Sequence, residues 1–115
     1  MENEVIILKE AESFIDTLPI KFQAKTYWTL QLLERFGIKL TQPYTKNVKG
    51  YKNIKELRVK FGSDINRLFY FNYKSKIFVV TSGYIKKSMK LDKLEIERAV
   101  KIMERFIKEQ EGEKA

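Results

Sequence analysis

The sequence predicts a single α+β domain over residues 1–115, in which an antiparallel sheet of three to four strands is packed by two N-terminal helices and one C-terminal helix. Three observations lead to this architecture. Apolar residues recur at helical spacing near both ends of the chain, apolar and polar residues alternate in its middle, and short turns join the alternating segments. A chain of 115 residues, 43% of them hydrophobic, is long enough to bury one core.

Two helices are expected in the first third of the chain, over residues 10–18 and 21–36, because apolar side chains recur there three and four residues apart. Pro19 separates them, since its ring fixes φ and removes a hydrogen-bond donor. Gly37 stands where a C-terminal cap glycine belongs and predicts a firm end of the second helix. The apolar run at residues 5–8 is too short to distinguish a strand from the start of a helix.

Three strands are expected over residues 54–61, 65–73 and 77–85, and their short connections predict antiparallel pairing. Gly83 interrupts the third strand, as at a bulge or a close backbone approach. Residues 44–55, before the strands, form a polar connector rich in Lys.

The first strand alternates cleanly: the apolar side chains of residues 57–61 face one way, and Arg58 and Lys60 face the other. The second strand places Arg67 among large aromatic residues. An Arg in such surroundings needs a partner or a function, because an unpaired buried charge is costly. Asp64, in the turn before it, is a candidate partner, and the alternative is that it only shapes the turn.

A C-terminal helix is expected over residues 93–109, with an apolar stripe along one side. Asp92 is expected to cap its N-terminus. A basic segment at residues 84–90 connects this helix to the third strand.

The chain contains no Cys and no His. The first absence excludes disulfides and thiolate catalysis, and the second removes the commonest metal ligand and the commonest general base at neutral pH. A glycine-rich phosphate loop is absent and carboxylates are sparse in the middle of the chain, so we expect neither a metal nor a cofactor. No apolar run approaches the roughly 18 residues that cross a bilayer. The acidic residues 1–4 do not match a secretory signal, so a cytoplasmic location without a membrane partner is expected.

Positive charge is concentrated in the middle of the chain. Residues 39–93 contain 14 Lys and Arg against three acidic residues, a net charge of +11, whereas the whole chain has +8. A middle this basic favours a polyanionic partner, with nucleic acid ahead of a membrane surface. Charge alone leaves open the alternative of an ordinary solvated surface.

A sheet face with Arg58, Lys60 and Arg67 suits phosphodiester chemistry without a metal. Fixed cations neutralise the charge that develops in the transition state, and RNA supplies its own nucleophile in the 2′-OH. A lysine desolvated beside other cations has a lowered pKa, which would let Lys60 act as the base. Tyr70 and Tyr84 are candidates for stacking on bases. The alternatives are a solvated strand face for the cations and a core position for the tyrosines.

Four lysines of the connector, Lys46, Lys49, Lys52 and Lys55, recur every three residues. A helical or 3₁₀ turn would align them as an RNA-binding row. The alternative is a set of ordinary surface lysines.

The middle of the sequence resembles the central signature of the HigB/RelE-type toxins, in their phage-derived subgroup. The matching stretch is Leu57-Arg58-Val59-Lys60-Phe61-Gly62-Ser63-Asp64-Ile65-Asn66-Arg67-Leu68-Phe69-Tyr70-Phe71. The resemblance extends forward through residues 83–87 and 95–99, and back through residues 14–19 and 32–37. It covers most of residues 14–106.

This resemblance implies a metal-independent endoribonuclease that cleaves ribosome-bound mRNA and so inhibits translation. It also implies a cognate helix-turn-helix antitoxin, through which alone the pair would bind operator DNA. Carried over by motif, Arg67 would stabilise the transition state, and Arg58 and Lys60 would contact phosphates or assist proton transfer. The candidate catalytic residues are Arg58, Lys60, Arg67, Tyr84, Lys86 and Lys87, and the candidate RNA-binding residues are Lys46, Lys49, Lys52, Lys55, Tyr70 and Lys90.

Three positions depart from the pattern of these toxins. Ser82 stands where many members have His, Met89 replaces part of a Thr-Gln pair, and Asp92 replaces a helix-opening Pro. These departures keep a second interpretation open: a non-catalytic RNA- or ribosome-binding module, either a decayed toxin or a phage accessory protein.

Overall fold

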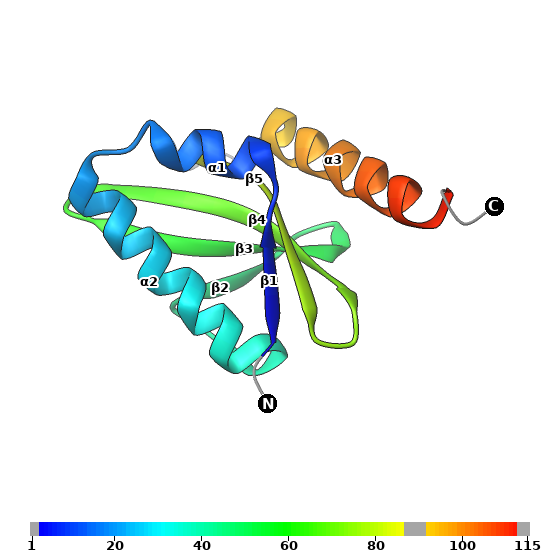
Figure 1. Ribbon diagram of the computed structural model, residues 1–115. Helices are drawn as coiled ribbons and strands as arrows, with labels where there is room; N and C mark the ends of the chain where they lie inside the picture. Colours follow the sequence, from blue (N-terminus) through cyan, green and yellow to red (C-terminus); the bar gives the residue numbers. More distant parts are fainter. Residues whose placement is uncertain (1–2, 87–91, 113–115) are drawn as a thin grey trace.

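The computed structural model describes residues 3–86 and 92–112. Its elements follow in the order β1 (Glu4–Ile7), α1 (Lys9–Asp16), α2 (Ile20–Phe36), the short 3₁₀ helix η1 (Gly37–Lys39), β2 (Thr45–Val48), β3 (Tyr51–Phe61), β4 (Asp64–Lys74), β5 (Ile77–Ile85) and α3 (Lys93–Gly112). The strands form one sheet in the order β1-β5-β4-β3-β2. Helices α1 and α2 pack on one face of the sheet and α3 packs on the other (Figure 1).

The predicted α+β architecture is confirmed, but the sheet has five strands and is mixed, since β1 runs parallel to β5. β1 forms from the apolar run whose type was ambiguous. A run of four residues is too short to show a clear hydrophobic period. Its partner strand β5 lies far along the sequence, so local pattern alone could not reveal this pairing.

The Lys-rich connector contains strands, so the helical or 3₁₀ turn that would have aligned its lysines is not formed. Its residues form an antiparallel hairpin of β2 and the start of β3. Gly50 adopts a φ of +87° at the turn, a conformation that glycine reaches without steric cost. The hairpin distributes the four lysines: Lys46 lies opposite Glu56, Lys49 precedes the turn, and Lys52 and Lys55 line a separate hollow, so they do not form one row.

Two of the expected helix ends are confirmed, the end of α2 and the start of α3. Gly37 follows α2 with a φ of +55°, and its backbone N–H donates to the carbonyl oxygen of Leu33. At the start of α3, the Asp92 carboxylate accepts a hydrogen bond from the backbone N–H of Glu95 at 3.4 Å. Such a cap satisfies one of the N–H groups that a helix leaves free in its first turn.

The alternation of apolar and charged side chains along β3 determines which face of the strand is buried in the core. Leu57 and Val59 are buried under α1 and α2, and Phe61 stacks on Phe22 of α2 with ring centroids 5.2 Å apart. Full burial of each such aliphatic side chain contributes about 1.5–3 kcal/mol. The intervening Arg58 therefore belongs to the opposite face of the sheet.

Gly83 marks a close approach between β5 and its neighbours, as its position in the strand predicted. A Cβ at this residue would lie 2.5 Å from Leu68 Cδ2 and 2.6 Å from Phe14 Cδ2. A bulge lies just before it, because Phe69 pairs with Ser82 and Tyr70 pairs with Val80, leaving Thr81 extra. The bulge re-aims the last residues of β5.

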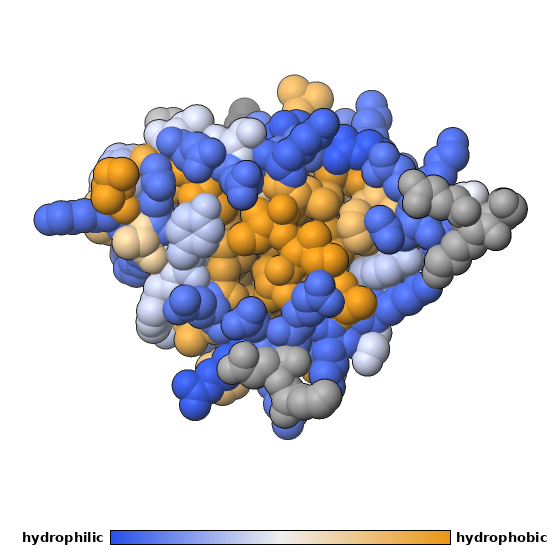
Figure 2. All heavy atoms as spheres, in the orientation of Figure 1, coloured by the Kyte–Doolittle hydropathy of each residue, from blue (hydrophilic) through white to orange (hydrophobic). Residues whose placement is uncertain are grey.

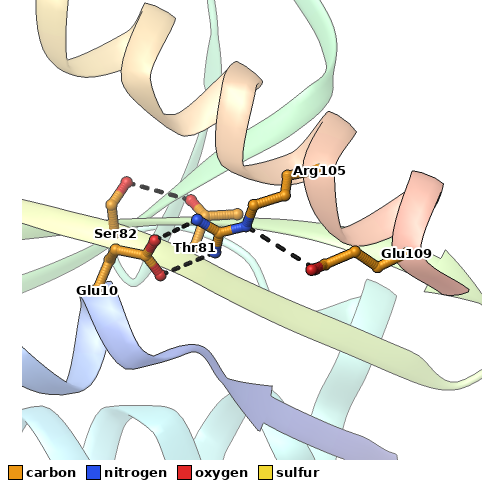
Figure 3. A network of polar contacts seen from close by, with 5 residues as sticks. All are labelled: Glu10, Thr81, Ser82, Arg105 and Glu109. Carbon is orange, nitrogen blue, oxygen red and sulfur yellow. Dashed lines mark hydrogen bonds and ion pairs between the residues drawn. The ribbon is translucent and has the colours of Figure 1, made fainter.

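A bidentate ion pair joins α1 to α3 (Figure 3). Arg105 donates from Nη1 to Glu10 Oε2 at 2.6 Å and from Nη2 to Glu10 Oε1 at 3.0 Å, and its Nε lies 3.9 Å from Glu109 Oε1. The Arg105 hydrogen bond lowers the pKa of Glu10, against a smaller opposing effect of burial. The pair links the two helix layers at one end of the sheet.

Replacing Arg105 with Gln is expected to destabilise the protein at neutral pH and to have no effect in acid. Because the folded-state pKa of Glu10 is lowered, the contribution is present above its ordinary value, about 4, and is lost as pH falls through the lowered value. Urea unfolding at pH 7 and pH 3 measures it. Arg105 is partly exposed, so a difference below about 1 kcal/mol is expected at pH 7.

Lys108→Gln removes the same charge from the exposed side of α3 and is the control for this test. If the wild type and Arg105→Gln differ in free energy of unfolding by the same amount at pH 3 as at pH 7, the ion pair with Glu10 is not the cause of the difference.

Apolar side chains gather on the face of the molecule that displays β1. Figure 2 shows an apolar area in the middle of this face, framed by hydrophilic side chains. Four consecutive apolar residues are half-buried along this edge strand and its exit: Val5, Ile6, Ile7 and Leu8.

Among the described helices, none has the length and apolar character needed to span a bilayer.

Candidate active site

Strand pairing brings the predicted cations together on the α3 side of the sheet. Arg58 of β3 lies directly opposite Arg67 of β4, and Arg67 lies opposite Tyr84 of β5. Lys46 of β2 lies opposite Glu56 of β3. Directly opposite residues share a face of the sheet, and Lys86 follows Tyr84 by two positions. We call this group, Lys46, Glu56, Arg58, Arg67, Tyr84 and Lys86, the arginine face.

Arg67 is buried and paired with Glu56. Its Nη1 donates to Glu56 Oε2 at 2.7 Å and to Oε1 at 3.3 Å, and the two side chains are 7% and 9% exposed. Asp64, one partner suggested by sequence, is exposed at the start of β4, so that suggestion was wrong. Glu56 reaches Arg67 because the antiparallel register places them on diagonal positions of the same face.

Two guanidinium N–H donors of the arginine face are unpartnered. The Nε atoms of Arg58 and Arg67 are buried, and neither has a hydrogen-bond partner within residues 3–86 and 92–112. A buried donor without a partner is costly, and an anionic ligand that accepts from it recovers that cost. The two unpartnered donors therefore mark this cross-strand pair as a candidate anion site.

Tyr84 lies against this pair and stacks on Phe69, with ring centroids 5.7 Å apart and planes 16° apart. Burial, reinforced by the Glu56 carboxylate, raises the pKa of Tyr84 to about 12. Its hydroxyl therefore stays protonated at neutral pH, so it can donate a hydrogen bond or a proton but cannot serve as the resting base.

The pKa of Lys86, in the arginine face, is lowered. Burial is the largest cause, followed by the Arg67 cation, with smaller effects of Lys46 and Arg58. Glu56 opposes the shift. A lowered pKa increases the neutral fraction of the amine, which is the form that accepts a proton.

Lys60 is not buried, although its predicted role as a base requires desolvation. It shares the face of Arg58 but is exposed near the end of β3, so the desolvation invoked for it is not found. Lys86, and not Lys60, is the lysine that is partly buried beside other cations.

The other connector lysines lie away from the arginine face, except for Lys46. Lys49 precedes the Gly50 turn, and Lys55 pairs with Tyr70 on the other side of the sheet. Lys52 and Lys55 line a separate hollow of about 490 Å³ that also involves Met103 of α3.

The suggestion that Tyr70 stacks on RNA is wrong for this structure. Tyr70 is 3% exposed and packs in the core beneath α1 and α2. Its hydroxyl and that of Thr45 share a hydrogen bond of 2.6 Å. The cause is the register of β4, which turns Arg67 and Phe69 toward α3 and Tyr70 away from it.

The predicted residues Lys87, Met89 and Lys90 lie outside the described residues. Ser82, one of the positions that depart from the toxin pattern that the sequence resembles, is fully buried in β5 and shares a 3.3 Å hydrogen bond with Thr81 (Figure 3). It lies inside the sheet at the bulge, so it does not supply an accessible titratable group.

Glu56 belongs to the site but was not predicted from the sequence to do so. The signal was available, because Glu56 falls two residues before Arg58 in the same alternation and therefore on the same face. Within residues 3–86 and 92–112, no group of three or more His, Cys, Asp or Glu is placed to hold a metal ion.

Comparisons with known proteins agree with this fold. A free-state structure of the E. coli toxin RelE, in which two arginines are replaced by alanine, matches with a TM-score of 0.61 and 17% identity over 88% of this chain and 97% of that one. The RelE–RelB complex from Pyrococcus horikoshii OT3 matches with a TM-score of 0.56 and 18% identity over 79% of this chain and 100% of that one. A search of curated proteins found no match.

The structural matches establish a RelE-like fold, and the resemblance to RelE-type toxins is confirmed. The model of one protein family, described as phage derived protein Gp49-like, matches residues 13–104 and so spans most of the chain. The chain belongs to this Gp49-like, phage-derived family.

Proposed function

We propose that this protein is the toxin of a toxin–antitoxin pair and that it cleaves ribosome-bound mRNA by attack of the substrate's own 2′-OH. Membership of the Gp49-like family and the RelE-like fold support the toxin class. The observation that supports cleavage is the cross-strand pair Arg58 and Arg67, each with a buried Nε–H that lacks a partner among the described residues.

The proposed chemistry uses groups of the arginine face. Lys86, in its neutral form, takes the proton of the 2′-OH as that oxygen attacks the adjacent phosphorus. Arg58 and Arg67 neutralise the charge of the phosphorane-like transition state. The protonated Tyr84 hydroxyl donates to the departing 5′-oxygen. The products are a 2′,3′-cyclic phosphate and a free 5′-hydroxyl.

The proposed partners follow from the family. A cognate helix-turn-helix antitoxin holds the toxin in check in the cytoplasm, and operator DNA is bound only through that antitoxin. The RelE–RelB complex among the structural matches supports an antitoxin partner in general terms.

A non-catalytic ribosome- or RNA-binding module is the second candidate. The observation that favours it is Ser82, a buried hydroxyl where many related toxins have His. Incubation of the purified protein with translating ribosomes and a defined mRNA separates the two. Cut fragments with 2′,3′-cyclic phosphate ends support the toxin assignment, and binding without cleavage supports the module.

Association with RNA is expected to weaken steeply with salt, because phosphate contacts release counterions. Lys46→Met should weaken binding and reduce the slope of log K against log salt concentration by about 0.7 for single-stranded RNA. Lys101→Met, on the exposed side of α3, removes the same charge away from the arginine face and should leave the slope unchanged. Fluorescence anisotropy at several salt concentrations measures both, and equal slopes for the two variants would contradict the placement of RNA on this face.

A further inference from the structure

A second hollow lies beside the arginine face, where the edge of β3 is open. β2 pairs with β3 only as far as Thr45 opposite Leu57, and the backbone N–H of Arg58 then donates to Tyr44 O at 2.8 Å. Beyond Arg58, this edge of β3 is bordered by α2 and by residues 43–44, which precede β2. These segments and β3 enclose a hollow of about 240 Å³.

The wall of this hollow is aromatic. Trp28 of α2 is 49% exposed, and its ring meets Tyr44 edge to face, with centroids 6.1 Å apart and planes 70° apart. A tryptophan with half its surface in water adds less to the core than a buried one. Large aromatic rings held in place but left open are the usual platforms for the bases of single-stranded RNA.

The rim of the hollow is cationic. Lys25, one helical turn before Trp28, lines it together with Arg58 and Lys60, and its lining among the described residues includes no acidic side chain. Arg58 is shared with the arginine face, where it opposes Arg67. Arg58 therefore connects the hollow on the α2 side of β3 with the arginine pair on the α3 side, around the open edge of the strand.

We propose that this hollow binds one nucleobase of the RNA substrate, stacked on Trp28, next to the phosphate at Arg58 and Arg67. The inference rests on the proposed function and deepens it, because it names a positioning site for the substrate outside the reacting groups. The volume is slightly below the roughly 300–1,000 Å³ of pockets for drug-sized ligands, which suits a fragment the size of one base.

Trp28 is the only tryptophan of the chain, so its fluorescence reports on this hollow alone. The probe is a short 2′-O-methyl oligoribonucleotide, which lacks the attacking hydroxyl and remains uncut. Titration should quench Trp28 fluorescence with the same midpoint as binding measured by anisotropy. A matching oligonucleotide with abasic positions keeps the phosphates and should bind with little quenching. Equal quenching by both probes, or none by either, would overturn the proposal.

Trp28→Ala is expected to weaken binding of the intact probe by about 5- to 150-fold, the range of base–aromatic stacking, and to leave binding of the abasic probe unchanged. Trp28→Phe should recover part of the loss. Phe36→Ala is the matched control, because Phe36 is 45% exposed on the same helix and does not line the hollow. In cleavage assays, Trp28→Ala should raise KM with a smaller effect on kcat.

These outcomes separate the proposal from the proposed function. If the wild type cuts mRNA and Trp28→Ala binds and cuts as well as Phe36→Ala, the base site is wrong and the toxin assignment stands. If the wild type does not cut but the intact probe quenches Trp28, the base site stands without the nuclease. If Trp28→Ala instead changes the sedimentation of the protein alone, Trp28 lies in a contact between two copies and the base site is wrong.

Discussion

Replacing Arg67 with Ala is expected to reduce mRNA cleavage by about 10²–10³-fold, because the variant loses a fixed cation aimed at the charge of the transition state. The same change leaves the buried Glu56 carboxylate without its partner. Breaking a buried ion pair from one side costs about 3–5 kcal/mol of stability. Urea unfolding and cleavage on translating ribosomes measure the two effects separately.

A double variant distinguishes lost chemistry from lost folding. Glu56→Leu combined with Arg67→Met replaces the whole pair with apolar side chains of similar size, which is often neutral or stabilising. We expect this protein to unfold close to the wild-type midpoint and still to lack cleavage. Recovery of cleavage together with stability would show that Arg67 serves folding alone, and the proposed role would be wrong.

Replacing Lys86 with Met is expected to reduce cleavage by about 10²–10⁴-fold, the usual contribution of a general base, and to remove the rising limb of the pH–rate profile. In the wild type the rate should rise with pH through the lowered pKa of Lys86, because the neutral amine is the active form. Single-turnover cleavage rates across a pH series measure the limb.

A second variant tests the electrostatic cause of this limb. Lys46 is one of the cations that lower the pKa of Lys86, so Lys46→Met should move the rising limb to higher pH. Lys101→Met lies outside the arginine face and should leave the limb in place. A limb that stays unchanged in Lys86→Met would assign the proton transfer to another group.

Local patterns predicted most of the fold because those patterns depend on near neighbours. The period of α2, the Gly37 end and the Asp92 cap each involve groups within a few residues, and all three are confirmed. The pairing of β1 with β5 joins distant segments, and nothing in a four-residue strand specifies its partner.

The candidate site divides in the same way. Alternation along β3 put Arg58 opposite the core, and the motif singled out Arg67, both from sequence alone. Their position directly across from each other follows from the β3–β4 register, which the Gly62 turn sets at a φ of +62°. Desolvation depends on what packs above a side chain, so only the structure could show that Lys86 is partly buried beside other cations and that Lys60 is exposed.

Composition, periodicity and motif spacing are properties of the chain, and they were enough to predict an α+β domain with a basic middle and a RelE-type signature. The tertiary structure decided which charges meet. It paired Arg67 with Glu56 instead of Asp64, buried Tyr70 and left Trp28 open beside Arg58. The physical reason is that pairing and burial depend on strand register and on the helices above the sheet, which bring together residues that the sequence keeps apart.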